Sequence, residues 1–412
     1  MEPSETRCLV STLSHVAYPF ERCEEFSPDG ESLEVRVPGI AHARLRGGNH
    51  LAERFAGFLP FEKCSLSASL GEGNTPLVRA DRRLCDLVGI QNLWLKNETQ
   101  NPTWSFKDRG TLACVWMAQA MGERVLCTIS TGNMGHSVAA YAARSGMRAV
   151  VFVPDFATRE KLASMSIHGA TIFRVHAPDY SAMKRHILDL AGTLNLRIVS
   201  GNGPVRVEGY KLTAFEMLEQ MEGDVPDYIA VPTSACGHIR GIFKGYRELR
   251  DAGLTSRLPR MVVVQAANNA PVVSGIRQGL DRVVPFANVQ TVAEAITTGN
   301  PPGGDEIVRK AKEHNWPAMD VTEAEILDGQ RQLARSGYFV EPAAATTVHA
   351  TRKLVLERKI EPGAKVVLML TGAGLKDLDV FRHHDVRVSD CTPDTVQAKL
   401  ADTLGEIQRA DW

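Results

Sequence analysis

A regular alternation of apolar strands and helices in the middle of the chain constrains the fold more than any other feature. The expected segments are strands at 124–129, 148–153, 171–175 and 196–199, separated by helices at 135–145, 161–168 and 180–194. Continuous apolar strands of this kind are typical of parallel sheets that helices cover on both faces. The sequence therefore predicts an α/β fold.

The same pattern continues on both sides of this block. Further strands are expected at 92–96, 228–232, 261–265 and 366–370, with helices at 106–119 and 210–221. We expect two doubly wound parallel-sheet domains. A small α/β domain over 119–205 is inserted into a large domain formed by 61–118 and 206–412, and 1–60 is an N-terminal appendage. Ligands of such sheets bind beyond the carboxyl ends of the strands, so a binding cleft is expected between the two domains.

Charge and composition exclude several classes of function. The formal net charge of −1 argues against a nucleic-acid surface. Apolar runs fall short of the roughly 20 residues that span a bilayer, and the first residues lack the apolar core of a signal peptide. We therefore expect a cytoplasmic protein without nucleic-acid or membrane partners. The eight cysteines form no CxxC pair, so neither a metal site nor a disulfide framework is expected.

Lys107 is the candidate nucleophile. It follows turn residues at 101–103 and a possible helix cap at Ser105, and an apolar helical run begins at Gly110. This places Lys107 in the first turn of a buried helix, where a lowered pKa would leave a neutral amine that can form an imine with an aldehyde. A single lysine near a helix start is ordinarily a surface charge, so the assignment depends on the surrounding motifs.

The segment from Asn101 to Gly110 resembles the lysine motif of the threonine synthases, which belong to the fold type II (tryptophan synthase β) group of pyridoxal phosphate enzymes. Other matching segments follow in the family's order: 71–77 (GEGNTPL), 130–133 (STGN), 206–211 (RVEGYK), 341–344 (EPAA) and 370–377 (LTGAGLKD). The resemblance implies pyridoxal 5'-phosphate as the cofactor, held by Lys107 as an imine in the cleft between the domains. It also implies a lyase that acts on O-phosphohomoserine, and a homodimer.

The resemblance assigns the cofactor contacts to turns that follow strands. Asn133 would donate to the ring hydroxyl oxygen, and the Thr371 hydroxyl would lie at the pyridine nitrogen, which suits elimination and replacement more than transamination. The turn expected to hold the cofactor phosphate through its backbone amides consists of Thr233, Ser234, Ala235, Cys236, Gly237 and His238. Ala235 and His238 replace asparagines of the family, and a role for His238 in capping or in the core is an equal alternative.

The substrate contacts are expected from a second set of residues. By resemblance, Ser130 and Thr131 hold the substrate carboxylate, and Arg206 binds its phosphate through a planar guanidinium. The full expected set is Ser130, Thr131, Met134, Arg206, Lys211 and Arg240. The alternative for Ser130 and Thr131 is an ordinary capping turn, and the alternative for Arg206 is a solvated arginine.

The sequence departs from the family mainly at substrate positions. Met134-Gly135, followed by His136, stands in place of a Thr-Ser pair, Ser200-Gly201 in place of an Asn-Ser pair, and Trp104 in place of a glycine. These changes are equally consistent with neutral core substitutions. If they are not neutral, they indicate that the family's reaction is retained and that the substrate is O-phosphohomoserine or a close analogue. The alternative is a β-elimination or β-replacement enzyme on a serine- or threonine-like or modified phosphohomoserine substrate. A binding protein without catalysis is less consistent, because binding alone does not require the imine.

Overall fold

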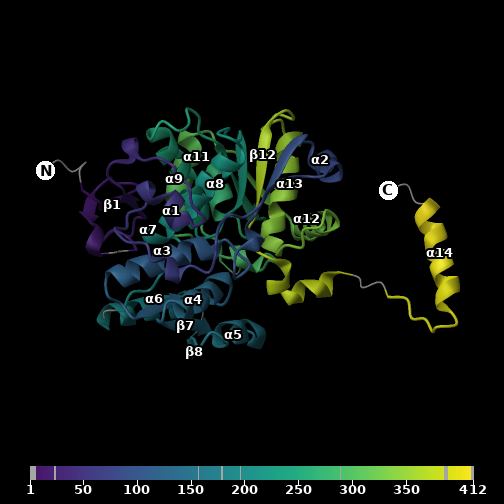
Figure 1. The fold of residues 1–412 in the computed structure, drawn as a ribbon, viewed down its shortest axis with the longest axis horizontal. Helices are drawn as coiled ribbons and strands as arrows, with labels where there is room; N and C mark the ends of the chain where they lie inside the picture. Colours follow the sequence, from purple (N-terminus) through teal and green to yellow (C-terminus); the bar gives the residue numbers. More distant parts are fainter. Residues whose placement is uncertain are drawn as a thin grey trace. The chain divides into compact units, whose positions relative to one another are not determined.

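A six-stranded sheet and a three-stranded parallel sheet carry most of the chain in the computed structural model (Figure 1). The structure describes residues 6–22, 25–155, 157–177, 180–194, 196–287, 289–384 and 388–409. Residues 1–377 form one compact unit, and Leu378–Trp412 form a second that contains α14 (Val396–Arg409). Single 3-10 turns lie at Phe20–Arg22, Ile40–His42, Ala56–Phe58, Leu66–Ala68, Glu98–Gln100, Glu294–Ile296, Gly374–Lys376 and Leu378–His383.

The six-stranded sheet has the order β11-β10-β9-β12-β5-β4. Its strands are β4 (Leu77–Arg79), β5 (Asn92–Asn97), β9 (Tyr228–Pro232), β10 (Arg260–Ala266), β11 (Ala318–Val321) and β12 (Lys365–Leu370). All neighbours are parallel except β4, which pairs antiparallel with β5. The central strands confirm the expected ones. The edge strands β4 and β11 span only three and four residues, which is too short for a recognisable strand pattern, and the sequence does not predict them.

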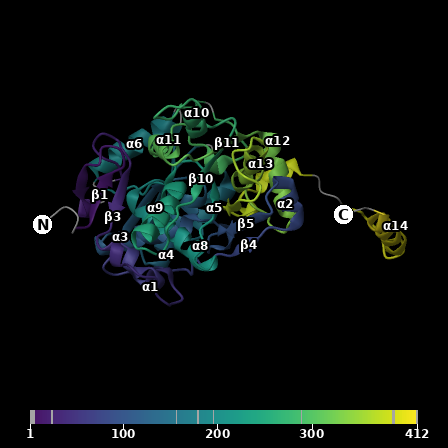
Figure 2. The same ribbon diagram turned by 90° about the horizontal axis from the view of Figure 1, so that it is seen from above.

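Helices cover both faces of this sheet because alternate side chains of its strands point to opposite sides. Ile229 and Val231 belong to the core that contains side chains of α8 (Leu212–Gln220), α9 (Gly237–Asp251), α10 (Pro271–Arg277) and α11 (Gly304–Glu313). Tyr228 and Ala230 belong to the core formed with α2 (Arg82–Val88), α12 (Glu323–Arg335) and α13 (Pro342–Leu356). Figure 2 shows α2, α12 and α13 together on one side of the sheet.

The smaller sheet is doubly wound, as expected. Its parallel strands β6 (Val125–Ile129), β7 (Arg148–Pro154) and β8 (Thr171–Val175) are adjacent in that order. On one face Val151 packs with side chains of α4 (Asn133–Arg144) and α5 (Arg159–Ser166). On the other face Phe152 packs with α6 (Tyr180–Thr193).

Two expected elements are corrected by the structure. The segment 196–199 forms a single bridge between Ile198 and Cys127, not a strand. The Val199 carbonyl accepts a hydrogen bond from the Thr128 hydroxyl at 2.9 Å, and the chain then turns at Ser200. The helix expected at 210–221 is instead α7 (Pro204–Tyr210) followed by α8, because Pro204 starts the helical segment earlier and Lys211 separates the two helices.

Helix α7 packs closely against α3 (Lys107–Ala120). A Cβ atom added to Gly110 of α3 would lie 2.5 Å from Arg206 Cγ, and one added to Gly209 would overlap the Arg109 carbonyl group. The two glycines therefore allow the helices to approach closely enough to place Arg206 beside the first turn of α3.

The N-terminal segment forms a small antiparallel sheet of its own. Strand β1 (Cys8–Ser11) pairs with β2 (Ala17–Pro19) and β3 (Leu33–Arg36), and α1 (Leu51–Arg54) follows. Strand β3 lies against α9, where Arg240 Nη2 donates to the Leu33 carbonyl at 2.7 Å. The expected domain boundaries stay a prediction, since residues 1–377 form one unit.

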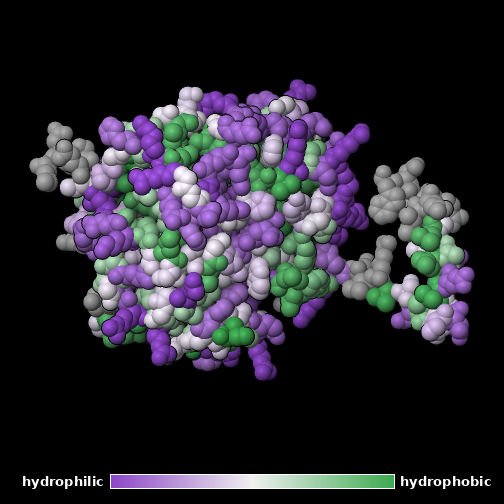
Figure 3. Space-filling model, viewed as in Figure 1, coloured by the Kyte–Doolittle hydropathy of each residue, from purple (hydrophilic) through white to green (hydrophobic). Residues whose placement is uncertain are grey.

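Within the part of the chain that the structure describes, no helix is long and apolar enough to cross a membrane. Nor does that part contain a group of three or more metal-binding side chains. Its cysteines are free: Cys8, Cys64, Cys85, Cys114, Cys127, Cys236 and Cys391. Cys23 lies outside the described residues. Hydrophilic residues are interspersed with hydrophobic ones on the face shown in Figure 3.

Candidate active site

Three segments that are distant in sequence are paired next to Lys107. Ser105 forms an antiparallel bridge with Gly372, and the Phe106 amide donates to the Thr371 carbonyl at 3.0 Å. The Glu341 amide donates to the Gly372 carbonyl at 2.9 Å. These backbone contacts bring the start of α3, the end of β12 and the start of α13 together, so that Lys107, Thr371 and Glu341 share one site.

The amine of Lys107 is suited to nucleophilic chemistry. Burial, followed by the positive charge of Arg206, lowers the pKa of Lys107 to about 7, against an opposing effect of Glu341. Its Nζ lies 4.3 Å from the centroid of the Phe106 ring. A large fraction of this amine is therefore neutral near pH 7, which is the form that attacks an aldehyde.

Glu341 holds together two of the expected cofactor residues. Its Oε2 accepts a hydrogen bond from Asn133 Nδ2 at 2.7 Å, and its Oε1 accepts one from Thr371 Oγ1 at 3.3 Å. Burial raises the pKa of Glu341, while Asn133, Lys376 and Lys107 act in the opposite direction. The motif that begins at Glu341 matches the family, but the sequence predicts no role for this residue. Its position before Pro342 at the start of a helix is the available signal.

Lys376 and Asp108 are two further residues of the site for which the sequence predicts no role. Lys376 Nζ donates to the Thr103 carbonyl at 2.7 Å, and burial lowers its pKa to about 8. Asp108 accepts hydrogen bonds from the Thr103 amide at 2.6 Å and from Ser137 Oγ at 2.6 Å. Burial raises the pKa of Asp108 to about 6. The site thus contains a second amine with a lowered pKa and a buried carboxyl that faces it.

The turn at 130–133 is organised by a serine side chain. Ser130 Oγ accepts from the Gly132 amide at 3.3 Å and from the Gly135 amide at 3.2 Å. This contact fixes the start of α4 and thereby the position of Asn133. Ser130 and Thr131 are both half-buried.

The turn from Thr233 to His238 follows β9 and leads into α9. Thr233 Oγ1 donates to the Val231 carbonyl at 2.8 Å, and Ser234 Oγ lies 2.8 Å from Thr298 Oγ1. Cys236 has a positive φ of 73°, and a Cβ atom on Gly237 would overlap the Gly201 carbonyl oxygen. The backbone amides at the start of α9 are therefore close to the turn at Ser200, without an intervening side chain from Gly237.

His238 packs beside the candidate nucleophile. Its ring stacks on Phe106 with centroids 3.9 Å apart, and burial lowers its pKa to about 3. Among the described residues neither of its ring nitrogens has a hydrogen-bond partner. A neutral ring thus supports the packing next to Lys107 and keeps polar atoms available at the site.

Arg206 is a buried cation next to the first turn of α3. Its Nη1 donates to Thr111 Oγ1 at 3.0 Å. Within the part of the chain that is described, its Nε and Nη2 have no well-aligned hydrogen-bond partner, and the hydroxyl of the nearby Tyr210 interacts with the guanidinium. A buried guanidinium with two unused donors can receive an anion.

Met134 and Ala235 lie on the two sides of Gly201. A Cβ atom at Gly201 would be 3.6 Å from the Ala235 Cβ and 4.0 Å from the Met134 Sδ. Apolar side chains therefore surround Gly201 in a region where the resemblance to the family leads us to expect polar residues.

The remaining two expected substrate residues have other partners. Lys211 Nζ pairs with Glu208 at 2.6 Å and with Glu248 at 2.8 Å, and Arg240 Nε pairs with Glu306 at 2.6 Å. Both side chains are fully buried in these ion pairs. Because their charges are already compensated, we leave Lys211 and Arg240 out of the proposed substrate site.

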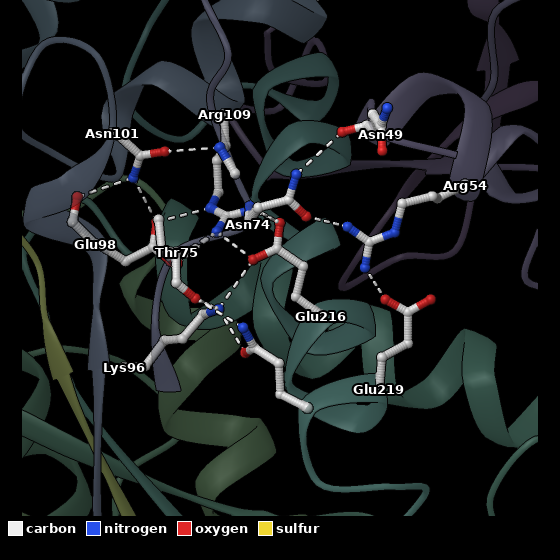
Figure 4. A network of polar contacts seen from close by, with 12 residues as sticks. Asn49, Arg54, Asn74, Thr75, Lys96, Glu98, Asn101, Arg109, Glu216 and Glu219 are labelled. Carbon is white, nitrogen blue, oxygen red and sulfur yellow. Dashed lines mark hydrogen bonds and ion pairs between the residues drawn. The ribbon is translucent and has the colours of Figure 1, made fainter. Parts of the chain in front are cut away.

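A buried charge network fixes the helix that carries Lys107 (Figure 4). Arg109 Nε donates to Glu98 Oε2 at 2.7 Å, and its Nη2 pairs with Glu216 Oε2 at 2.7 Å. Lys96 Nζ pairs with the same Glu216 at 2.9 Å. The network joins α3 to β5 and α8, so the backbone two residues after Lys107 is held from two sides.

The residues present are suited to pyridoxal phosphate. The site combines a partly neutral lysine with an amide donor on Asn133 and a hydroxyl on Thr371. In this structure both groups donate hydrogen bonds to Glu341. The backbone amides at the start of α9 favour an anionic group such as a phosphate. Lys107 would hold the cofactor aldehyde, and Asn133 and Thr371 would hold its ring.

Comparison with known proteins identifies the family of the chain. Residues 68–372 match the family described as pyridoxal-phosphate dependent enzymes. The chain is 37% identical to a threonine synthase of Methanocaldococcus jannaschii over 90% of this chain and 89% of that protein. It is 36% identical to a threonine synthase of Methanosarcina acetivorans over 79% and 80% of the two chains.

Solved structures show the same fold at low sequence identity. The processed form of threonine deaminase isoform 2 from Solanum lycopersicum superposes with a TM-score of 0.65 at 18% identity, over 83% of this chain and 94% of that one. Maize serine racemase superposes with a TM-score of 0.63 at 17% identity, over 82% and 94%. From its sequence and its fold, the chain belongs to the pyridoxal-phosphate dependent enzymes of fold type II and is related to the threonine synthases.

Proposed function

We propose that this enzyme is a threonine synthase-type lyase, which acts on O-phosphohomoserine or a close analogue by γ-elimination of phosphate and β-addition of water. The observation that carries the proposal is the position of Lys107. An amine with a pKa of about 7 lies beside the Asn133–Glu341–Thr371 contacts and beside the buried Arg206.

Lys107 would have two roles. As a neutral amine it would hold the cofactor aldehyde, and after its release it would accept a proton from the substrate and return one. Pyridoxal phosphate, when bound, supplies an electron sink for the removal of that proton. The lowered pKa supports both roles, because the free amine must be neutral to act as a base near pH 7.

Arg206 would bind the leaving group. Its unused Nε and Nη2 donors match an anion, and its helix packs directly against the helix of Lys107. Ser130 and Thr131 would face the substrate carboxylate at the turn before α4. Lys376, with a pKa of about 8, would be a second group able to donate or accept a proton in the same site.

A second candidate function is favoured by the apolar contact around Gly201. Met134, Gly201 and Ala235 supply no side-chain hydrogen-bond donor where a phosphate ester would need several. This arrangement supports β-elimination or β-replacement on a serine- or threonine-like substrate, or on a modified phosphohomoserine, with the same lysine chemistry.

The two candidates are separated by one assay on the holoenzyme. Incubation with O-phosphohomoserine should release inorganic phosphate and threonine in equal amounts under the first function. Serine, threonine and O-phosphoserine, incubated in parallel, should yield keto acids only under the second. Absence of phosphate release from O-phosphohomoserine, together with turnover of one of the other three, would overturn the first proposal.

We further propose a homodimer, because twofold dimers are the commonest soluble oligomers, and a cytoplasmic location. Light scattering of the purified holoenzyme should give twice the chain mass. A monomeric mass would contradict the dimer.

A further inference from the structure

The N-terminal segment contributes a carboxylate to the turn that precedes α7. Glu25 Oε2 accepts a hydrogen bond from the Ser200 amide at 3.2 Å and another from the Ser200 hydroxyl. A Cβ atom on Gly203 would overlap the Glu25 carboxylate, so this group lies directly on the backbone of the turn from Ser200 to Gly203. That turn leads into α7, which carries Arg206.

Helix α9 ties the turn that Glu25 contacts to strand β3. Arg240 Nη1 donates to the carbonyl and to the side-chain oxygen of Asn202, both at 2.8 Å, and its Nη2 donates to the Leu33 carbonyl at 2.7 Å. Asn202 Nδ2 in turn donates to Ser32 Oγ at 3.0 Å, and Lys244 donates to the Val35 carbonyl. Arg240 thus ties β3 and the turn at Ser200 to the same helix, which explains why an arginine stands at this position.

The carboxyl of Glu25 faces several charged or titratable groups. These are Arg206 on α7, Arg197 after α6, Lys184 on α6 and Cys114 on α3. Burial raises the pKa of Glu25, while the contact with Ser200 and the charges of Arg206 and Arg197 act in the opposite direction. Glu25 therefore occupies the hydrogen-bond donors of Ser200 and offsets part of the positive potential of Arg206 and Arg197.

We propose that Glu25 is a specificity-determining residue for the distal group of the substrate. Its carboxylate competes with that group for Ser200 and Arg206, so it weakens the binding of a dianionic phosphate more than the binding of a distal group that carries one negative charge or none. The inference rests on the proposed function in one respect only, which is that the pocket at Arg206 receives the distal group.

Sulfate tests the competition directly, because it is a dianion that does not titrate in the neutral range. Calorimetric titration of the holoenzyme with sulfate at pH 8 should show at least tenfold tighter binding by Glu25→Gln than by the wild type. Glu21→Gln is the matched control: it makes the same charge change in the same segment, but the Glu21 side chain is 75% exposed and its partner is Arg7. Equal sulfate affinity of Glu25→Gln and the wild type would overturn the proposal.

The affinity for sulfate should change with pH in a direction that the charge of Glu25 determines. Wild-type sulfate binding should weaken as the pH rises through the pKa of Glu25, because the carboxylate then carries its full charge. The difference in affinity between Glu25→Gln and the wild type should grow with pH and disappear in acid. A difference that stays constant with pH would contradict an electrostatic competition.

Kinetics separate this role from a structural one. With O-phosphohomoserine, Glu25→Gln should lower KM at least tenfold and leave kcat within twofold, whereas a distorted turn would lower kcat. If the wild type does not turn over this substrate, the proposed function fails, but the sulfate titration still decides the role of Glu25. If Glu25→Gln does not fold, Glu25→Asp replaces it; the retracted carboxylate should give sulfate affinity above that of the wild type, and equal affinity would overturn the proposal.

Discussion

Glu341 Oε2 accepts a hydrogen bond from Asn133 Nδ2 at 2.7 Å, although the two residues are 208 positions apart. Through its other oxygen Glu341 accepts from Thr371 at 3.3 Å. One buried carboxylate therefore organises two side chains that would hold the cofactor ring, and its negative charge favours the charged form of Lys107. This relationship makes Glu341 a positioning residue whose electrostatic effect can be measured.

Glu341→Gln should lower the pKa of Lys107. The negative charge of Glu341 raises this pKa, so its removal leaves burial and the positive charges of Arg206 and Lys376 unopposed. The pH at which apoenzyme takes up pyridoxal phosphate at half its maximal rate should move downward. Glu357→Gln, at the exposed far end of α13, should leave it unchanged. An unchanged midpoint in Glu341→Gln would show that this charge does not act on Lys107, and an upward shift would contradict the sign of its effect.

Lys107→Ala should abolish covalent attachment of the cofactor. The variant should lose the visible absorbance of attached pyridoxal phosphate, and turnover should fall by roughly 10²–10⁴-fold or more, which is the usual contribution of a catalytic base. Lys161→Ala on α5 removes a lysine that pairs with Glu294, and it should keep both properties. Retention of the absorbance by Lys107→Ala would assign the attachment to another lysine.

Cofactor uptake should depend on pH with a midpoint near 7. The amine reacts when neutral, so the rate should rise about tenfold per pH unit below this pKa and level off above it, whereas an ordinary lysine would continue to rise to about pH 10. Arg206→Gln removes a positive charge that lowers the pKa, so the midpoint should move upward. Arg148→Gln, at an exposed position of β7, is the control. A wild-type midpoint near 10 would contradict the desolvated site.

Apolar strands were predictable from sequence because five consecutive buried residues leave a clear pattern, as at Tyr228–Pro232. The edge strand Ala318–Val321 was not, since four residues that include an aspartate carry no such pattern. In the site, local motifs identified Lys107, but the pairing of Glu341 with Asn133 depends on contacts between distant segments. For the same reason the charge of Lys211 was visible in the sequence, whereas its pairing with the buried carboxylates of Glu208 and Glu248 was not.

Glu216→Gln should destabilise the fold strongly. Burial would raise the pKa of Glu216, but the charges of Arg109 and Lys96 outweigh it and hold the pKa well below its usual range. Removing this charge leaves Lys96 buried without the carboxylate that it pairs with and leaves Arg109 paired with Glu98 alone. Breaking a buried ion pair in this way costs about 3–5 kcal/mol of unfolding free energy. Urea unfolding at pH 7 measures the loss.

The matched control for Glu216 lies three residues further on α8. Glu219 pairs with Arg54 nearer the surface (Figure 4), so Glu219→Gln should cost about 0–1 kcal/mol. The stabilisation from Glu216 is present above the pKa of about 4.3 that a glutamate has in the unfolded chain, and it is lost as the pH falls below this value. The wild type should therefore lose stability in acid more steeply than Glu216→Gln, and parallel curves would contradict the assigned ion pairs.

Gly201→Ser should return a hydroxyl to the substrate pocket without disturbing the fold. A Cβ atom at this position meets the Ala235 Cβ at 3.6 Å and the Met134 Sδ at 4.0 Å, which are ordinary van der Waals distances. At Gly237 a Cβ atom would overlap the Gly201 carbonyl oxygen, so Gly237→Ser is the contrasting variant and should unfold at a lower temperature. If the substrate carries a phosphate at this end, the new hydroxyl adds a donor, and KM for O-phosphohomoserine should fall several-fold with kcat little changed. The opposite result would be a higher KM in a Gly201→Ser variant whose melting temperature equals that of the wild type. It would show that the surface around Gly201 contacts an apolar part of the substrate, which favours the second candidate function.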